Sequence, residues 1–246
     1  MEYTVKGGSP MKSASACLVI GVYRDAQLAT DADTLGATAY DHLQGILAQG
    51  DLEGDTGQNM LIYAVPGLRA KRVMLVGLGE RDKLTPAVMG KAIGAAATRL
   101  QQAGNDEATC LLPLPADDLA LTYQRVSSAL LAVAAATYRF DTCKSDPKPP
   151  KKPLTQWHFL VPDRTVANRA KQAVAHAEAI AHGMALARDL ANLPGNICTP
   201  NYLAQQALEL GQRHDKLRVS VLDEPEMAEL GMGALLSVSR GSRQPA

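Results

Sequence analysis

Apolar positions in the first part of the chain fall into two patterns, short unbroken runs and longer stretches with helical spacing. Unbroken runs bounded by polar or turn residues are typical of buried strands. They predict strands at residues 16–22, 60–65, 72–78, 109–112 and 155–161. Apolar residues three and four apart predict helices at 33–48, from Thr85-Pro86 onward, and at 117–137. This alternation predicts an α/β domain with helices on both faces of a parallel or mixed sheet.

The segment 141–153 lies between the last helix and the last strand of this domain. It holds four prolines and four lysines in thirteen residues, which disfavours a helix or a central strand. No aromatic residue interleaves the lysines, so a solvated loop explains them better than a nucleic-acid-binding patch. We expect the first domain to cover residues 1–162.

From Asp163 onward the pattern changes to one long apolar stripe. Apolar residues from Val166 to Ala191 recur at helical intervals and predict a single helix over 165–192. At 1.5 Å per residue this helix is roughly 40 Å long, a length that suits a connection between two domains. We expect residues 163–193 to form a bridging helix.

The sequence NLPGNICTP after this helix predicts a sharp corner between two helices. Pro194 disfavours helical geometry at the preceding residue, and Gly195 allows the chain to turn. Thr199-Pro200 then begins the next helix as N-cap and first helical residue. Two short amide side chains suited to satisfying backbone groups flank the turn, Asn192 and Asn196.

Residues 194–246 carry little sheet-forming sequence. One strand is expected at 216–222, a possible second one at 234–238, and two helices complete the segment. So few strands do not form a stable domain alone. We therefore expect this segment to be the incomplete start of a larger α/β domain.

Composition and charge narrow the classes of partner. The 25 Lys and Arg residues balance 25 Asp and Glu residues, so nothing in the net charge favours nucleic acid, acidic substrates or a membrane surface. The four cysteines lie far apart without a CxxC pair, which predicts reduced thiols: Cys17, Cys110, Cys143 and Cys198. Neither a signal-peptide pattern nor an apolar run of the roughly 18–20 residues that cross a bilayer is visible. We expect a cytoplasmic protein without a membrane partner.

Short motifs of known binding and catalytic sites are incomplete in this sequence. Gly77 and Gly79 follow a strand, but Asp82 stands where a dinucleotide fingerprint has its third glycine. The Gly-Lys pair within 89–92 lacks the other P-loop residues. The sequence SVSRG at 237–241 resembles a nucleophile elbow, yet no histidine follows His214 to act as the base.

Metal-ligand patterns are missing as well. The five histidines contain no i,i+4 pair, and His176 and His182 lie on different sides of one helix. The five are His42, His158, His176, His182 and His214. The paired carboxylates lie in loops or at helix starts, where capping is their expected role: Asp31 with Asp33 and Asp117 with Asp118. From the residues alone we name no catalytic, metal-binding or cofactor-binding residue.

Two blocks near the end of the chain carry a resemblance to a known family. Their residues are, in order, Arg188-Asp189-Leu190, Asn192, Pro194, Asn196, Thr199-Pro200, then Met232-Gly233-Ala234 and Arg240-Gly241-Ser242. This arrangement resembles the entry to the catalytic domain of the leucyl aminopeptidase family, cytosolic metallopeptidases with two metal ions. The preceding residues fit the family's macrodomain-like N-terminal domain by pattern only.

The resemblance implies an α/β fold with three parts: a macrodomain-like N-terminal domain with a mixed sheet and flanking helices, a bridging helix at 163–193, and the truncated start of an α/β peptidase domain at 194–246. It also implies a hydrolase that removes N-terminal residues from peptides, uses two divalent metal ions (manganese or zinc), and forms a homo-hexamer in the cytoplasm.

The family's functional residues sit in motifs of the GKGxTFDxGG and NTDAEGR type, and neither motif occurs in this chain. No position here receives their roles, so the chain alone is expected to be inactive and to bind no catalytic metal. A non-catalytic alternative is a ligand-, DNA- or assembly-binding module, because macrodomain-like folds bind ADP-ribose and some bacterial members of the family bind DNA. The neutral charge argues against an intrinsic DNA clamp.

Overall fold

The computed structural model describes all residues of the chain except 149, 151, 162, 243, 245 and 246. The chain divides into two compact units, Met1–Met184 (unit 1) and Ala185–Ala246 (unit 2), and each is described by itself. The division falls inside one long helix, α5 (Arg164–Asn192), which confirms the single helix expected over 165–192. The domain boundaries expected at 162 and 193 stay predictions.

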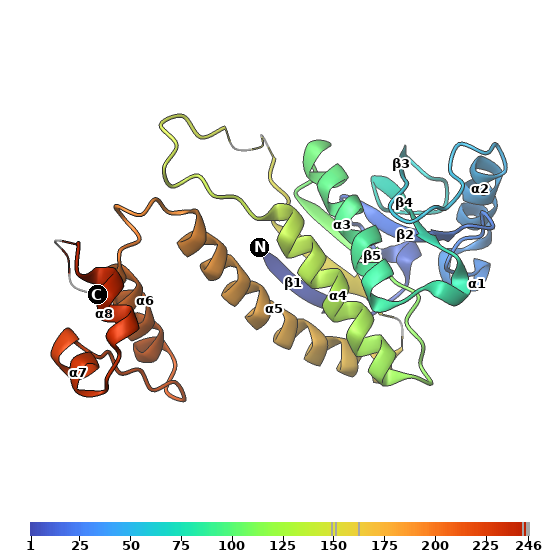
Figure 1. The fold of residues 1–246 in the computed structure, drawn as a ribbon. Coiled ribbons are helices and arrows are strands. Elements are labelled where there is room, and N and C mark those ends of the chain that lie inside the picture. Colours follow the sequence, from blue (N-terminus) through green and yellow to red (C-terminus); the bar gives the residue numbers. More distant parts are fainter. Residues whose placement is uncertain (149, 151, 162, 243, 245–246) are drawn as a thin grey trace. The chain divides into compact units, whose positions relative to one another are not determined.

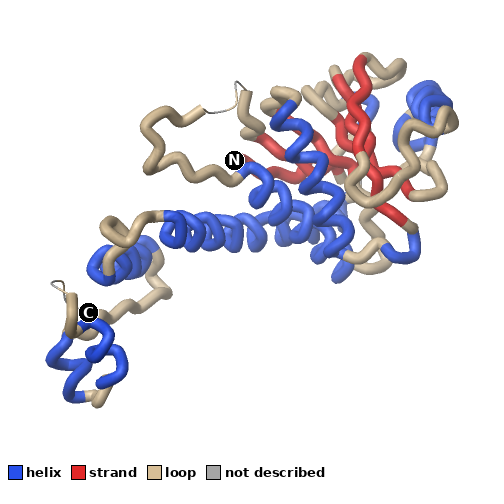
Figure 2. The backbone as a smooth tube through the Cα atoms, turned by 45° about the horizontal axis from the view of Figure 1, so that its top comes forward, coloured by secondary structure: helices blue, strands red, loops and turns tan. Residues whose placement is uncertain are grey.

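Unit 1 is built on a six-stranded mixed sheet (Figures 1 and 2). Its order across the sheet is β1 (Glu2–Lys6), β6 (Gln156–Leu160), β5 (Glu107–Leu111), β2 (Leu18–Tyr23), β4 (Arg72–Gly79) and β3 (Asn59–Tyr63). All neighbours are parallel except β3 and β4, which are antiparallel. The α/β class and the mixed sheet predicted from the sequence are therefore confirmed.

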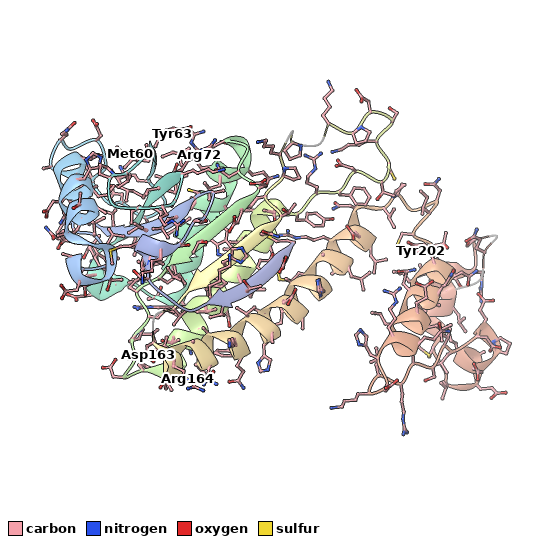
Figure 3. All side chains as sticks on the ribbon, turned by 180° about the vertical axis from the view of Figure 1, so that it is seen from behind. Met60, Tyr63, Arg72, Asp163, Arg164 and Tyr202 are labelled. Atoms are coloured by element: carbon pink, nitrogen blue, oxygen red, sulfur yellow. The ribbon has the colours of Figure 1, made fainter. Side chains whose placement is uncertain are left out.

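The two edge strands differ from the sequence expectation. β1 was not predicted, because its sequence EYTVK is short and has polar residues at alternate positions. β3 was expected to be buried like β4, but its residues are only half-buried and Tyr63 is 63% exposed. An apolar run cannot show whether a strand has neighbours on both sides, and β3 has only β4. Arg72 of β4 covers the exposed ring, with its guanidinium 5.2 Å from the Tyr63 centroid (Figure 3).

Four helices precede α5 in unit 1: α1 (Ala32–Leu35), α2 (Ala37–Leu47), α3 (Pro86–Gln102) and α4 (Leu119–Thr137). Two short 3-10 turns, η1 (Pro10–Lys12) and η2 (Arg81–Lys83), complete it. The single helix expected at 33–48 is broken at Gly36, whose φ is +89°. A Cβ there would lie 2.6 Å from Met11 Sδ, so the break serves close packing.

Two hydrophobic cores cover the sheet. The first packs α3, α4 and the start of α5 against one face, with Trp157 and Phe159 fully buried. The second packs α1 and α2 against the other face, but only over β2, β3 and β4. Neither core contains a residue from that second face of β1, β6 and β5, where polar side chains lie beside the buried Leu160.

Helix α4 is the only described helix whose length and apolar composition would allow it to cross a bilayer. This is weak evidence, because a core helix of a globular domain has the same properties. Here α4 packs along α3, and Val126, Leu130 and Val133 are fully buried in the first core.

Unit 2 holds the end of α5 and three further helices, α6 (Pro200–Arg213), α7 (Glu224–Glu229) and α8 (Gly233–Ser239). The predicted corner is confirmed: α5 ends at Asn192, and the N–H groups of Ile197 and Cys198 both donate to the Pro194 carbonyl. Thr199 caps α6 by accepting a 3.3 Å hydrogen bond from the Tyr202 N–H.

Both strand predictions in this unit are wrong. Residues 216–222 are irregular, and residues 234–238 lie in α8. A strand needs a neighbour to pair its backbone groups, and the described part of unit 2 contains no strand. The apolar run at 234–238 instead closes helical hydrogen bonds, starting with the Leu236 N–H to the Met232 carbonyl.

Candidate functional site

The carboxyl edge of the central strands, where open α/β sheets commonly bind ligands, is occupied by side chains of the protein itself. The Arg81 guanidinium lies 4.1 Å from the Tyr23 ring centroid. Arg125 donates to the carbonyls of Pro113 at 2.7 Å and Leu84 at 3.0 Å. These contacts join the ends of β2, β4 and β5.

The glycines at this edge serve backbone packing. A Cβ on Gly77 would lie 2.0 Å from the Asp55 carbonyl oxygen, and Gly79 has a φ of +77°. The chain segment at 54–56 therefore occupies the space beside these glycines that a bound phosphate would need. This agrees with the incomplete dinucleotide fingerprint in the sequence.

The other incomplete motifs also have structural roles. Gly90 of the Gly-Lys pair lies inside α3, where a Cβ would lie 3.2 Å from the Ser128 carbonyl oxygen on α4. In the SVSRG segment, Ser237 and Ser239 donate to carbonyls of their own helix, at Ala234 and Leu236. A nucleophile elbow requires a strand-to-helix turn, and this segment is part of α8.

The capping roles predicted for carboxylates are confirmed at two helix starts. Asp31 accepts a 2.7 Å hydrogen bond from the Thr34 N–H. Hydrogen bonding by the Thr34 side chain, and second by its backbone N–H, lowers the pKa of the Asp31 carboxyl group. Asp118 accepts one of 2.8 Å from the Leu121 N–H.

The carboxylates of unit 2 are also engaged locally. Asp223 and Glu226 form a reciprocal capping box on α7, and Glu209 pairs with Arg213 at 3.0 Å along α6. Among the described residues, no three His, Cys, Asp or Glu side chains converge to hold a metal ion. The two-metal site of the resemblance therefore does not fit onto this part of the chain, and we derive no chemical step through it.

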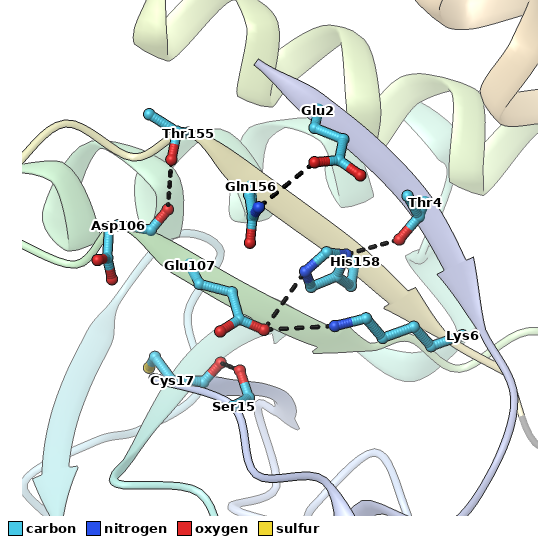
Figure 4. Close-up of polar contacts among 10 residues, drawn as sticks. All are labelled: Glu2, Thr4, Lys6, Ser15, Cys17, Asp106, Glu107, Thr155, Gln156 and His158. Carbon is cyan, nitrogen blue, oxygen red and sulfur yellow. Dashed lines mark hydrogen bonds and ion pairs between the residues drawn. The ribbon is translucent and has the colours of Figure 1, made fainter.

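Polar side chains gather on the uncovered face of β1, β6 and β5 (Figure 4). His158 is 4% exposed, and its Nδ1 lies 2.6 Å from Thr4 Oγ1. Glu107 Oε1 lies 3.3 Å from both Lys6 Nζ and His158 Nε2. The alignment at Nε2 is too poor for a hydrogen bond, so this atom has no hydrogen-bond partner in the described structure.

Burial lowers the pKa of His158, and the positive charge of Lys6 lowers it further. The carboxylate of Glu107 raises it, but this effect is smaller. The ring is therefore neutral near pH 7. The spacing of the histidines indicated no site role for His158, and no motif in the sequence contains Glu107 or Lys6. The available signal was the polar residue at every second position of β1 and the pair Gln156 and His158 in β6, which becomes meaningful once the two strands are known to be neighbours.

The other histidines do not join this group. His176 is exposed and contacts Tyr123, with Nδ1 2.9 Å from the tyrosine hydroxyl oxygen, and the remaining three are also exposed: His42, His182 and His214. The four cysteines are free thiols, as expected. Burial raises the pKa of Cys17 to about 12, so this thiol is not an activated nucleophile.

Unit 2 carries an apolar groove with a volume of about 650 Å³. Helix α6, the irregular segment after it and helix α8 line the groove, with Leu203, Val221 and Leu235 among the lining residues. All three are exposed by 46–49%. Unit 2 is therefore defined by an open apolar surface, and not by converging polar groups.

Comparison with protein families identifies the class of protein. Residues 19–147 match the cytosol aminopeptidase family, N-terminal domain, and residues 185–246 match the catalytic domain of the same family. The chain belongs to the cytosol aminopeptidase family, which confirms the resemblance read from the sequence.

Individual relatives agree with this assignment. The chain is 41% identical to a probable cytosol aminopeptidase of Halorhodospira halophila and 42% identical to one of Alkalilimnicola ehrlichii, over 100% and 99% of its length. It covers 49% of each of these relatives. The chain thus spans about half the length of the curated relatives it matches.

Solved structures share the fold. A tomato leucine aminopeptidase mutant matches with a TM-score of 0.79 and 21% identity, covering 100% of this chain and 49% of the other. The bottromycin maturation enzyme BotP in complex with Mn matches with a TM-score of 0.69 and 24% identity, over 94% and 43%. At these identities the likeness concerns the fold alone.

Proposed function

We propose that this chain is the N-terminal portion of an aminopeptidase that removes N-terminal residues from peptides with the help of two divalent metal ions, manganese or zinc. The family match over 185–246 to the catalytic domain is the observation that carries this proposal. The metal ions and the catalytic groups would be held by residues outside the described ones, because no metal-ligating group of three occurs among those.

The surface of unit 2 supports this assignment. Leu203, Leu235 and Val238 expose large apolar areas, and Val238 is 83% exposed. Exposed apolar area of this kind is normally covered by a partner or by further chain. In a complete catalytic domain, added strands would cover the groove and turn α6 and α8 into core helices.

Unit 1 would be an accessory domain in this proposal. Its carboxyl edge is filled by Arg81 and Arg125, which leaves little reason to assign it chemistry of its own. We propose that the complete protein is cytoplasmic, assembles as a homo-hexamer and has no membrane partner, as the family resemblance implies.

The experiment compares two proteins of confirmed intact mass, the 26.1 kDa chain and the complete gene product. Both are assayed with a leucine anilide after dialysis and addition of Mn²⁺ or Zn²⁺. We expect turnover and two retained metal equivalents only in the longer protein. Turnover by the 246-residue chain would place the chemistry in residues that we assign to structure, and an inactive, metal-free long protein would refute the proposed activity.

A further inference from the structure

A cavity of about 420 Å³ lies at the polar face of β1, β6 and β5 in unit 1. One wall is the end of these strands, with Lys6, Glu107 and Leu160. The other wall is the segment 7–15 between β1 and β2, which includes Ser9 and Lys12. We call this cavity the strand-end cavity.

The strand-end cavity presents both signs of charge. Lys6 lies 3.3 Å from Glu107, a long distance for an ion pair, and the two side chains are 45% and 27% exposed. Lys12 is exposed and forms no ion pair with any described residue. The cavity therefore offers one carboxylate and a second ammonium group that has no counter-charge.

The carboxylate of Glu107 has remaining acceptor capacity. Its contacts to Lys6 and His158 both end on Oε1, as Figure 4 shows. Within the described structure no hydrogen bond or ion pair ends on Oε2. Because burial lowers the pKa of His158, that ring is neutral near pH 7, and among the described residues Lys6 alone pairs a positive charge with Glu107. A ligand ammonium could therefore be accepted there.

The opposite wall carries unused donors. Ser9 Oγ is buried and makes no hydrogen bond to the described protein. The N–H groups of Gly7 and Gly8 likewise donate to none of the residues that the structure describes. Gly8 has a φ of +121°, a backbone conformation that side chains disfavour, and this bend forms part of the wall.

We propose that the strand-end cavity binds a small zwitterionic α-amino acid. Its ammonium group pairs with Glu107, its carboxylate is bound by Lys12 and the donors at Gly7 to Ser9, and an aliphatic side chain packs along Leu160 and Ala14. A simple anion such as phosphate would meet the Glu107 carboxylate, and a simple cation would meet two lysines. A ligand with both charges satisfies both walls.

This inference concerns unit 1 alone and does not rest on the proposed peptidase activity. A free amino acid is the product of an aminopeptidase, so the site would allow the protein to sense its product. Failure of either idea leaves the other unaffected, because amino-acid binding is measured without turnover.

The test uses calorimetry and amide NMR on the 246-residue chain with L-leucine as the probe. Two analogues each lack one charge: 4-methylpentanoate has no ammonium, and 3-methylbutylamine has no carboxylate. Inorganic phosphate tests a plain anion site. We expect one equivalent of leucine to bind, each analogue and phosphate to bind at least tenfold more weakly, and amide shifts to concentrate at residues 7–15.

Variants identify the residues. Lys12→Gln and Glu107→Gln should each weaken leucine binding at least tenfold, whereas the control Lys83→Gln, which changes an exposed lysine paired with Glu80, should leave it unchanged. If Glu107→Gln unfolds the protein, Lys12→Gln decides, since Lys12 is exposed. No leucine binding, equal binding of 4-methylpentanoate or phosphate, or unchanged binding in Lys12→Gln would each overturn the proposal.

Discussion

Both units of this chain contain many apolar residues, but they bury these residues to very different extents. In unit 1, two cores enclose most large apolar side chains, with Phe159 and Leu130 at 1% and 0% exposure. In unit 2, Met227 at 9% is the one buried hydrophobic residue within the described part. Unit 1 has a six-stranded sheet on which its helices pack, and described unit 2 consists of helices and irregular chain. An amphipathic helix without a partner surface stays exposed.

The largest expected effect is a difference in lost stability between a core mutation in unit 1 and a matched mutation in unit 2. Phe159→Ala should lower the free energy of unfolding by about 3–5 kcal/mol, because it opens a cavity in the first core. The matched change Leu235→Ala, at a residue that is 46% exposed, should cost less than about 0.5 kcal/mol. Urea unfolding followed by far-UV circular dichroism, which reports the helices of both units, measures both. Equal losses would mean that unit 2 is packed as tightly as unit 1.

Limited proteolysis should sharpen the boundary between the units. The buried stripe of α5 runs from Val166 to Ala181, so this part of the helix should be protected together with the sheet. Cuts are expected after residue 184 and within the segment 141–153, of which residues 142–148 are exposed. Mass spectrometry of the resistant fragment gives its end. A fragment that ends near residue 162 would support the shorter domain expected from the sequence and show that α5 contributes little.

Two matched helix caps test whether the units unfold together. Thr85 caps α3 in unit 1 and Thr199 caps α6 in unit 2, each at 3.3 Å and each followed by proline. Replacing either threonine with alanine should cost about 1 kcal/mol of helix stability. We expect Thr85→Ala to lower the global unfolding free energy and Thr199→Ala only to increase amide exchange in α6. A global effect of Thr199→Ala would show that the units are coupled.

Pro194→Ala tests the corner within unit 2. The alanine restores an N–H and removes the steric limit on Leu193, so helix α5 should extend by about a turn. Amide exchange and carbon chemical shifts at 193–197 should report new helix. Unchanged shifts would show that the bonds from Ile197 and Cys198 to the Pro194 carbonyl hold the corner without the proline ring.

The smallest expected effect is a change in how stability depends on pH, caused by His158 on the polar face of unit 1. The pKa of His158 is lowered in the folded state, so the unfolded chain binds a proton first as pH falls below about 6.5. Stability from this residue is complete above that pH and decreases as the pH falls toward the folded-state pKa. His158→Gln should flatten this decrease, and the control His182→Gln, at an exposed residue, should not. An unchanged pH profile in His158→Gln would assign the slope to other groups.

Much of the local structure could be predicted from residue patterns because the causes are local. The proline and threonine at 199–200 define the start of α6, and the periodic stripe after Asp163 defines α5. The two sequence blocks around Pro194 and Gly233, which resemble the family, indicated the family membership that the comparisons confirm.

Other features depend on contacts between distant residues and left no local signal. The apolar run at 234–238 suits a strand or a helix, and it forms α8 because no neighbouring strand is described in unit 2. The apolar run of β3 likewise does not reveal that it lies at an edge.

The sequence by itself determined the α/β alternation, the long helix, the corner and the family, because periodicity, proline geometry and capping act within a few residues. Only the tertiary structure decided that β1, β6 and β5 are neighbours and that, within the described chain, the second core does not extend over them. Lys6, Glu107 and His158 lie far apart in the chain, and parallel pairing brings them to one cavity wall and its adjacent surface. Side chains separated by about a hundred residues meet only after the sheet has formed, so no spacing rule along the chain could have grouped them.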